Sequence, residues 1–205
     1  MGALVLSCVA LLSAAAGEAR GEGVVVALGD SLTAGLGVTV DEAFPARLQA
    51  RLRAEGYDYR VVNAGVSGDT TAGGLRRVDW ALRAHPDVVI VALGANDGLR
   101  GQSPQAIRAN LEEIVARLQA AGARVLLAGM RLPPNYGAEF TKEFEAVFPA
   151  VARRAKIAFM PFLLDGVATD PRLNQPDGIH PTAAGHQVIA DHLWSYLRPM
   201  LRGGK

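Results

Sequence analysis

The sequence predicts an α/β fold, in which a parallel sheet is covered by helices on both faces. Short β-branched apolar runs alternate with windows of helical periodicity along the chain after Gly23. The run DVVIVAL at residues 87–93 is apolar without a break after its first residue, as expected of a strand whose two faces are both buried. Repeated alternation of strands and helices is typical of βαβ units, which build parallel sheets.

Five runs are expected to form the strands because they are short, apolar and rich in β-branched residues. The first run, VVVAL, stops abruptly at Gly-Asp-Ser. A helical window separates each strand from the next, so the connections are expected to be crossovers between parallel neighbours. The expected strands are residues 24–28, 59–63, 87–93, 124–129 and 156–159.

The windows between and after these runs repeat apolar residues every three to four positions, which indicates amphipathic helices. In the clearest window Ile107, Leu111 and Leu118 lie on one face. Pro149 is expected to kink or divide the helix that contains it. The expected helices are residues 41–55, 71–83, 104–121, 139–154 and 181–201.

Composition limits the classes of function that the chain can have. A chain of 205 residues without an internal linker or repeat is most simply one domain, here residues 20–205. Its net charge of +1 creates no field that would attract nucleic acid. Cys8 is its one cysteine, which excludes an internal disulfide and a cysteine-based metal site. We expect a monomer with no nucleic-acid partner.

The first 19 residues differ in character from the rest of the chain. An apolar core at residues 3–12 precedes small residues at 14–16, as in the hydrophobic region and cleavage site of a secretory signal. The stretch lacks the Lys or Arg that usually begins such a signal. It is also too short to span a membrane. We expect residues 1–19 to be a signal peptide, and we expect no stable membrane insertion.

Polar residues gather where three of the expected strands end. Residues 29–31 follow the first strand, residues 63–70 the second and residues 94–97 the third. Another polar turn, at residues 177–181, precedes the last helix. Ligands of open parallel sheets bind at the carboxyl ends of the strands. The fold is therefore expected to bring these loops together.

The residue types in these loops match the needs of acyl transfer. Ser31 can act as a nucleophile if a base removes its proton, and His180 can be that base. Asp177 lies three residues before His180, which allows its carboxylate to reach Nδ1 and leaves Nε2 to face Ser31. The backbone N–H groups of Ser31 and Gly68 and the side-chain amide of Asn96 are candidates for an oxyanion hole.

Each residue also has an ordinary structural explanation. Ser31 could cap the helix that follows it. Asn96 could belong to a plain turn, Asp177 to an Asp-Gly turn, and His180 could cap or pack. These explanations require several unrelated coincidences in the right order, so the combination favours the catalytic interpretation.

With these residues the chain resembles the SGNH, or GDSL, hydrolase superfamily, which is named after a serine, a glycine, an asparagine and a histidine in four blocks. They correspond to Ser31 in GDSLTAG, Gly68 in NAGVSGDTT, Asn96 in LGANDGLRG and His180 in DGIHP. The triad aspartate of the family corresponds to Asp177. The resemblance runs from residue 24 to the C-terminus; Ala95 departs from it, since a second glycine is common there.

The segments SGDTTAGGLRR, GANDGLRG, RLPPNYG and DGIHP resemble the bacterial thioesterase I, lysophospholipase L1 and arylesterase branch. This resemblance implies a flavodoxin-like, three-layer α/β/α sandwich with a five-stranded parallel sheet in 2-1-3-4-5 order. It implies hydrolysis of acyl esters or thioesters, such as acyl-CoA-type thioesters, lysophospholipids and aryl esters, through an acyl-enzyme intermediate. It further implies a periplasmic or secreted enzyme that needs no metal and no organic cofactor.

The RLPPNYG segment is expected to border the acyl chain of the substrate. Two prolines stiffen it, and its tyrosine offers an amphipathic face. The substrate-binding candidates are Leu132, Pro133, Pro134, Asn135 and Tyr136.

Three other interpretations were weighed against an esterase. A nucleotide-binding domain is disfavoured because residues 29–35 lack the Lys-Ser/Thr of a P-loop, and no Gly-x-Gly-x-x-Gly follows the first strand. A ligand-binding domain without catalysis is disfavoured by the intact serine, histidine and aspartate. A carbohydrate O-deacetylase on the same fold stays open, and hydrolysis of esters of increasing chain length would separate it from an acyl esterase.

Overall fold

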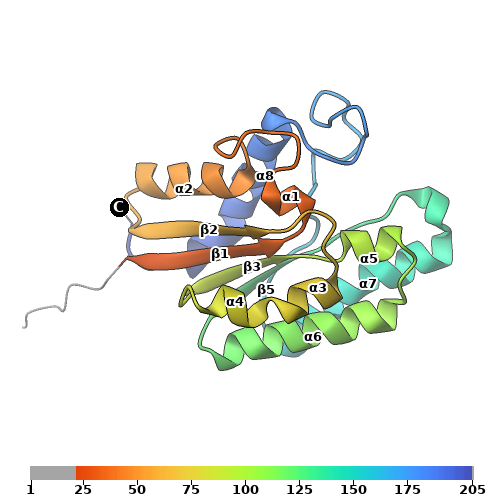
Figure 1. Ribbon diagram of the computed structural model, residues 1–205, viewed down its shortest axis with the longest axis horizontal. Helices are drawn as coiled ribbons and strands as arrows, with labels where there is room; N and C mark the ends of the chain where they lie inside the picture. Colours follow the sequence, from red (N-terminus) through yellow and green to blue (C-terminus); the bar gives the residue numbers. More distant parts are fainter. Residues whose placement is uncertain (1–21, 205) are drawn as a thin grey trace, which may run out of the picture.

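The computed structural model describes residues 22–204, so the expected signal peptide lies outside the described residues. Five parallel strands form one sheet in the order β2-β1-β3-β4-β5. Helices α2 and α8 cover one face of the sheet, and α3, α4, α6 and α7 cover the other (Figure 1). The predicted three-layer fold class and the predicted strand order are both confirmed.

All five expected strands are present, with ends that differ from the expected ones by up to two residues. Their bounds are β1 Gly23–Gly29, β2 Tyr59–Gly65, β3 Val88–Ala92, β4 Arg124–Ala128 and β5 Ala158–Met160. β1 and β3 lie in the middle of the sheet. In this register Val26 of β1 pairs with Val62 on one side and with Val89 on the other. Both central strands are buried along nearly their whole length, as their apolar sequences predict.

The helices include two short ones, α1 and α5, that the periodicity did not predict. Each begins within three residues of the end of a central strand. They are too short to show a helical repeat in the sequence. The helix bounds are α1 Ser31–Ala34, α2 Phe44–Ala54, α3 Thr71–Arg76, α4 Val78–Leu82, α5 Ala95–Leu99, α6 Pro104–Ala120, α7 Ala138–Ala155 and α8 Ala183–Leu197, with 3₁₀ turns at Pro134–Tyr136 and Arg198–Met200.

Two expectations about helix continuity were wrong. The expected helix at residues 71–83 is divided at Arg77, which leaves helical geometry with φ −100° and ψ 0°. The expected division at Pro149 does not occur, because α7 runs through it as one helix, and the expected kink there stays a prediction. A proline removes only one backbone hydrogen bond, and the buried Phe144 and Phe148 hold this helix against the core on the N-terminal side of Pro149.

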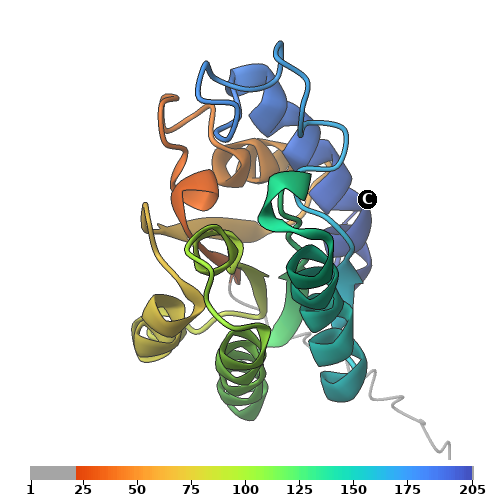
Figure 2. The ribbon, with the colours of Figure 1, turned by 90° about the vertical axis from the view of Figure 1, so that its right-hand side faces the viewer.

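The carboxyl ends of the strands all point to one edge of the sheet, which faces the viewer in Figure 2. The segments that follow β1, β2 and β3 lie at this edge, together with the loop that precedes α8. The fold thus brings together the four polar loops that the sequence analysis singled out.

Candidate active site

Ser31, His180 and Asp177 form a continuous chain of hydrogen bonds. Ser31 is the first residue of α1, directly after β1. His180 Nε2 lies 3.0 Å from Ser31 Oγ, and His180 Nδ1 lies 2.6 Å from Asp177 Oδ2. The three sequence-predicted side chains therefore meet, in the order that proton transfer from serine to histidine requires.

The loop that carries His180 is organised by Asp177. Its Oδ1 accepts hydrogen bonds from the backbone N–H groups of Ile179, at 2.9 Å, and of His180, at 3.0 Å. The N–H and the ring of His180, followed by the N–H of Ile179, lower the pKa of Asp177 to about 2. The carboxylate is therefore ionised at neutral pH and can hold the imidazole in one orientation.

A second aspartate, Asp30, lies directly before the serine and is fully buried. Its Oδ1 accepts the backbone N–H of Leu32 at 3.0 Å and so caps α1. Burial raises the pKa of Asp30 to about 6, against the opposing effect of the Leu32 hydrogen bond. Asp30 was not among the residues predicted to have a role, although Asp is a favoured N-cap and the position could have been recognised as one.

The three oxyanion candidates occupy the same edge. Gly68 has a φ of +79°, a conformation that L side chains rarely adopt. Within residues 22–204 the backbone N–H groups of Ser31 and Gly68 donate to no other protein group. Asn96 Nδ2 donates to the Asp69 carbonyl oxygen at 2.9 Å and to Asp30 Oδ2 at 3.3 Å. The amide thus bridges the loops that follow β1 and β2.

Two further contacts fix these loops, and sequence reasoning identified neither. The buried Asp97 accepts the backbone N–H of Thr71 at 2.8 Å and its hydroxyl at 2.6 Å, which joins the loop of Asn96 to the start of α3. Arg77 binds the Asp69 carboxylate and donates to the carbonyl oxygens of Gly29 and Ala64. Arg77 also lies at the break in the helix that was expected at residues 71–83.

A cavity of about 490 Å³ opens beside Ser31 and His180. Its walls are mostly apolar, and its volume suits a small ligand. Among the expected substrate-binding residues, Leu132, Pro133 and Pro134 line it. The other lining residues are Asp30, Leu32, Ala95, Asn96, Leu99, Met130, Arg131, Phe162, Leu164, Ala168, Thr169, Asn174, Gly178 and Ile179.

Asn135 and Tyr136 do not belong to the cavity wall, contrary to the expectation. Pro134, Asn135 and Tyr136 form a 3₁₀ turn, of which only Pro134 lines the cavity. The Tyr136 hydroxyl donates to the Leu99 carbonyl oxygen at 3.3 Å, and Leu99 does line the cavity. Tyr136 thus contacts the wall from behind and does not face the cavity.

The segment that follows β5 also forms part of the wall, and the sequence analysis missed it. Phe162, Leu164, Ala168 and Thr169 all line the cavity. Thr169 has a φ of +70°, which is rare for a β-branched residue. The strand-end argument that identified the other loops applies to the fifth strand too, but this segment is mainly apolar and was not recognised.

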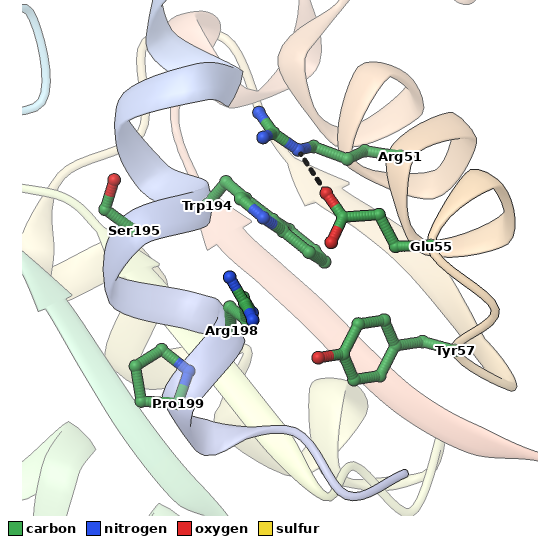
Figure 3. Close-up of a pocket in the computed structure, with 7 residues that line it drawn as sticks. All are labelled: Arg51, Glu55, Tyr57, Trp194, Ser195, Arg198 and Pro199. Carbon is green, nitrogen blue, oxygen red and sulfur yellow. Dashed lines mark hydrogen bonds and ion pairs between the residues drawn. The ribbon is translucent and has the colours of Figure 1, made fainter. Parts of the chain in front are cut away.

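A second hollow, of about 590 Å³, lies between α2 and α8. Figure 3 shows the Arg51–Glu55 ion pair beside Trp194, with Tyr57 below Glu55 on the same side of the hollow. Tyr57 precedes β2, so this hollow lies at the amino ends of the strands, opposite the serine. It contains none of the predicted site residues. We therefore place the candidate active site at the smaller, more apolar cavity, which adjoins the Ser31–His180 pair.

Within residues 22–204 no group of three or more His, Cys, Asp or Glu side chains is arranged to hold a metal ion. No helix in the same part of the chain is long and apolar enough to cross a membrane.

A hydrogen-bonded Asp–His–Ser chain beside an apolar cavity is the arrangement of a serine hydrolase. A model of the GDSL-like lipase/acylhydrolase family matches residues 27–188. The chain therefore belongs to the GDSL-like lipase/acylhydrolase family.

Known proteins resemble the chain over most of its length. Esterase TesA of Pseudomonas aeruginosa is 45% identical over 203 residues, which cover 98% of this chain and 100% of the relative. Thioesterase 1/protease 1/lysophospholipase L1 of Escherichia coli is 39% identical over 175 residues, which cover 85% of this chain and 83% of the relative. The crystal structure of TesA superposes with a TM-score of 0.84 at 45% identity and covers 87% of this chain and 99% of that one.

Proposed function

We propose that this GDSL-type esterase uses Ser31 as its nucleophile and cleaves acyl esters or thioesters through an acyl-enzyme intermediate. The observation that carries the proposal is the chain of hydrogen bonds from Asp177 through His180 to Ser31 at the side of an apolar cavity. The serine supplies the attacking oxygen, and the cavity supplies a place for the acyl chain.

In the first step Ser31 Oγ attacks the carbonyl carbon of the substrate. His180 Nε2, 3.0 Å away, takes the serine proton as the new bond forms. The imidazolium is stabilised by the ionised Asp177. The same proton then passes to the leaving alcohol or thiol as its bond to the acyl carbon breaks, which leaves an ester on Ser31.

The negative charge that develops on the carbonyl oxygen needs hydrogen-bond donors. The N–H groups of Ser31 and Gly68 are free to supply two of them. Both protons of the Asn96 amide already have acceptors, at 2.9 and 3.3 Å. We propose that the longer bond, to Asp30, is exchanged for the oxyanion in the transition state, because the oxyanion is the closer and more basic acceptor there.

In the second step water hydrolyses the acyl-enzyme. His180 takes a proton from the water as the water oxygen attacks the acyl carbon, and then returns this proton to Ser31 Oγ as the ester bond breaks. The products are a carboxylic acid and free enzyme. All three groups return to their starting protonation states, so the cycle consumes no co-reactant besides water.

The acyl chain is proposed to lie in the cavity, against Leu132, Pro133 and Pro134, with Asn135 and Tyr136 supporting this loop from outside. The leaving group is proposed to be a thiol of the acyl-CoA type, a lysophospholipid headgroup or a phenol. The similarity to relatives named esterase and thioesterase 1/protease 1/lysophospholipase L1 supports this range of leaving groups.

We further propose that the enzyme works as a monomer, without metal or organic cofactor, on small-molecule substrates and not on nucleic acid. All three residues of the proposed triad come from one chain, so the proposed catalysis needs no second copy. Export to the periplasm or the medium is proposed from the composition of residues 1–19. The mass of the protein recovered from cells would show whether residues 1–19 are removed, which tests the export. Its elution volume in size-exclusion chromatography would test the monomer.

The central test uses an organophosphonate, which labels activated serines covalently. Labelling of Ser31, located by peptide mass spectrometry, is expected together with loss of ester hydrolysis. Labelling of a different serine would overturn the assignment. Rates on aryl esters, acyl thioesters and lysophospholipids of increasing chain length would then rank the substrates, and turnover of acetyl esters alone would instead indicate a deacetylase.

A further inference from the structure

The catalytic cavity shares a wall with a third, smaller cavity, which is distinct from the hollow between α2 and α8. The smaller one, which we call the outer chamber, has a volume of about 250 Å³. It is lined by Arg131, Met160, Pro161, Phe162, Asp165, His192, Ser195 and Tyr196. Only Arg131 and Phe162 also line the catalytic cavity. These two side chains therefore form the partition between the two spaces.

The partition consists of one weak contact between side chains. The Arg131 guanidinium carbon lies 4.9 Å from the centre of the Phe162 ring, within the range of a cation–π interaction. Arg131 is exposed and Phe162 is half-buried. In the described part of the chain Arg131 makes no ion pair and no side-chain hydrogen bond. Cation–π contacts at exposed sites are weak, so little opposes rotation of these side chains.

The backbone on both sides of the partition is fixed. Gly129 donates its N–H to the Met160 carbonyl oxygen at 2.8 Å and accepts the N–H of Leu163 at 2.9 Å. A Cβ at Gly129 would lie 2.3 Å from the Pro161 carbonyl oxygen, so the two strand ends approach closely. The partition can therefore open by side-chain rotation, while the loops that carry it stay in place.

We propose that the Arg131–Phe162 pair is a movable partition and that the outer chamber holds the distal part of long acyl chains. This inference rests on the proposed esterase function, because it assumes that the acyl chain enters the catalytic cavity. Short chains fit within the catalytic cavity with the partition closed. Longer chains displace the Phe162 ring and continue along Met160 and Pro161 toward the face of α8 that carries Ser195.

The test measures kcat/KM for p-nitrophenyl esters from four to sixteen carbons, and its readout is the ratio of the long-chain to the short-chain value. Phe162→Ala removes the ring and is expected to raise this ratio by roughly tenfold, the value of burying about two further methylene groups. Arg131→Gln leaves the ring in place but removes its partner, so a smaller rise is expected.

A second substitution separates entry into the chamber from mere enlargement of the cavity. His192 is half-buried on α8 and lines the chamber but neither the catalytic cavity nor the hollow between α2 and α8, so His192→Trp fills the chamber alone. The double variant Phe162→Ala/His192→Trp is expected to lose the gain of Phe162→Ala. Leu164→Ala is the matched control, because Leu164 lines only the catalytic cavity. It is expected to give no comparable rise.

The possible outcomes are distinct. A gain that survives in the double variant, or an equal gain from Leu164→Ala, overturns the outer chamber as a subsite. An unchanged ratio in Phe162→Ala, with ester hydrolysis that still depends on Ser31, also overturns it and leaves the proposed function standing. Absence of ester hydrolysis in the unmodified protein would instead overturn the proposed function. If Phe162→Ala does not fold, Phe162→Leu keeps an apolar side chain without the ring and replaces it in the same comparison.

Discussion

The loop with Asp30 and Ser31 and the loop with Asp177 and His180 meet at the proposed catalytic site, yet their surroundings are opposite. Asp30 has none of its surface exposed, whereas the Asp177 side chain keeps 46% of its surface exposed. The first loop joins a central strand to a helix. The second is a turn whose hydrogen bonds are mostly local, apart from the contact with Ser31.

The pKa values of the two aspartates consequently shift in opposite directions. Burial raises the pKa of Asp30 to about 6, while local hydrogen bonds lower the pKa of Asp177 to about 2. The surroundings of each aspartate therefore decide its pKa, although both aspartates lie close to Ser31 or His180. The buried loop positions the proposed nucleophile at a cost in charge burial, and the exposed loop holds an ionised partner for the proposed base.

The largest effect on activity is expected from a substitution in the buried loop. Ser31→Ala should lower kcat/KM for ester hydrolysis by at least about 10⁴-fold, because it removes the proposed nucleophile. Its hydroxyl contacts His180 and contributes little to the apolar core, so the midpoint of thermal unfolding should change little. Residual hydrolysis within tenfold of the unmodified enzyme would mean that another group attacks the substrate.

The next effect concerns the amide that is hydrogen-bonded to the buried loop. Asn96→Ala should lower kcat by about 10²–10³-fold with a much smaller change in KM, since an oxyanion donor acts mainly in the transition state. Steady-state kinetics on one ester would measure both constants. A change confined to KM, or no change, would show that Asn96 only joins the loops around Asp30 and Asp69.

The positions of Ser31 and Asn96 could be predicted from the sequence, whereas the helix break at Arg77 could not. The strands were predictable because a parallel sheet buried on both faces requires apolar runs, and Ser31 and Asn96 follow such runs directly. The break at Arg77 was not predicted, and Arg77 makes contacts with Asp69 and with two strand ends that lie up to 48 residues away in sequence. The helical repeat of apolar residues gives no information about such contacts.

The residues of the cavity wall could likewise be predicted only in part from the sequence. The stiff segment around Pro133 and Pro134 was recognised from its composition, but its outward turn at Asn135 and Tyr136 was not. Phe162 contributes to the wall because the short edge strand β5 ends beside β4. Its role depends on tertiary position, and the local sequence has no distinguishing pattern.

The third effect is on stability, and it tests the cost of burying Asp30. Since folding raises the pKa of Asp30 from 3.8 to about 6, the folded state binds this proton more tightly, and the free energy of unfolding falls as pH rises from about 4 to 6. Buried His186 has the opposite effect, because desolvation lowers its pKa from 6.5 to about 4, and stability rises over nearly the same window. Each contribution is about 3 kcal/mol.

Asp30→Asn removes one of these opposing contributions. The variant should therefore gain stability between pH 4 and 6.5 relative to the unmodified protein, by about 3 kcal/mol, as measured by urea unfolding at several pH values. Other titrating groups are common to both proteins, so the difference isolates Asp30. His186→Gln is the matched control and should lose stability over the same range. Parallel pH curves for Asp30→Asn and the unmodified protein would show that Asp30 is not forced to keep its proton.

The smallest effect is expected from the exposed loop. Asp177→Asn removes the negative charge beside His180 Nδ1 but keeps a side chain of the same size. Because the native carboxylate is partly exposed, solvent screens its charge, and we expect kcat/KM to fall by about 10–100-fold, less than for a buried triad aspartate.

The pH dependence of this variant separates a triad from a dyad. Activity should rise with pH in both proteins, because the base must be neutral to accept the serine proton. Asp177 stays ionised over that range, since its pKa is near 2, and its charge favours the protonated imidazole. Removing the charge should move the acidic limb of the kcat/KM profile to lower pH. A limb that does not move, together with a rate close to that of the unmodified enzyme, would reduce the triad to a Ser31–His180 dyad, and the exposed loop would then serve only to position the histidine.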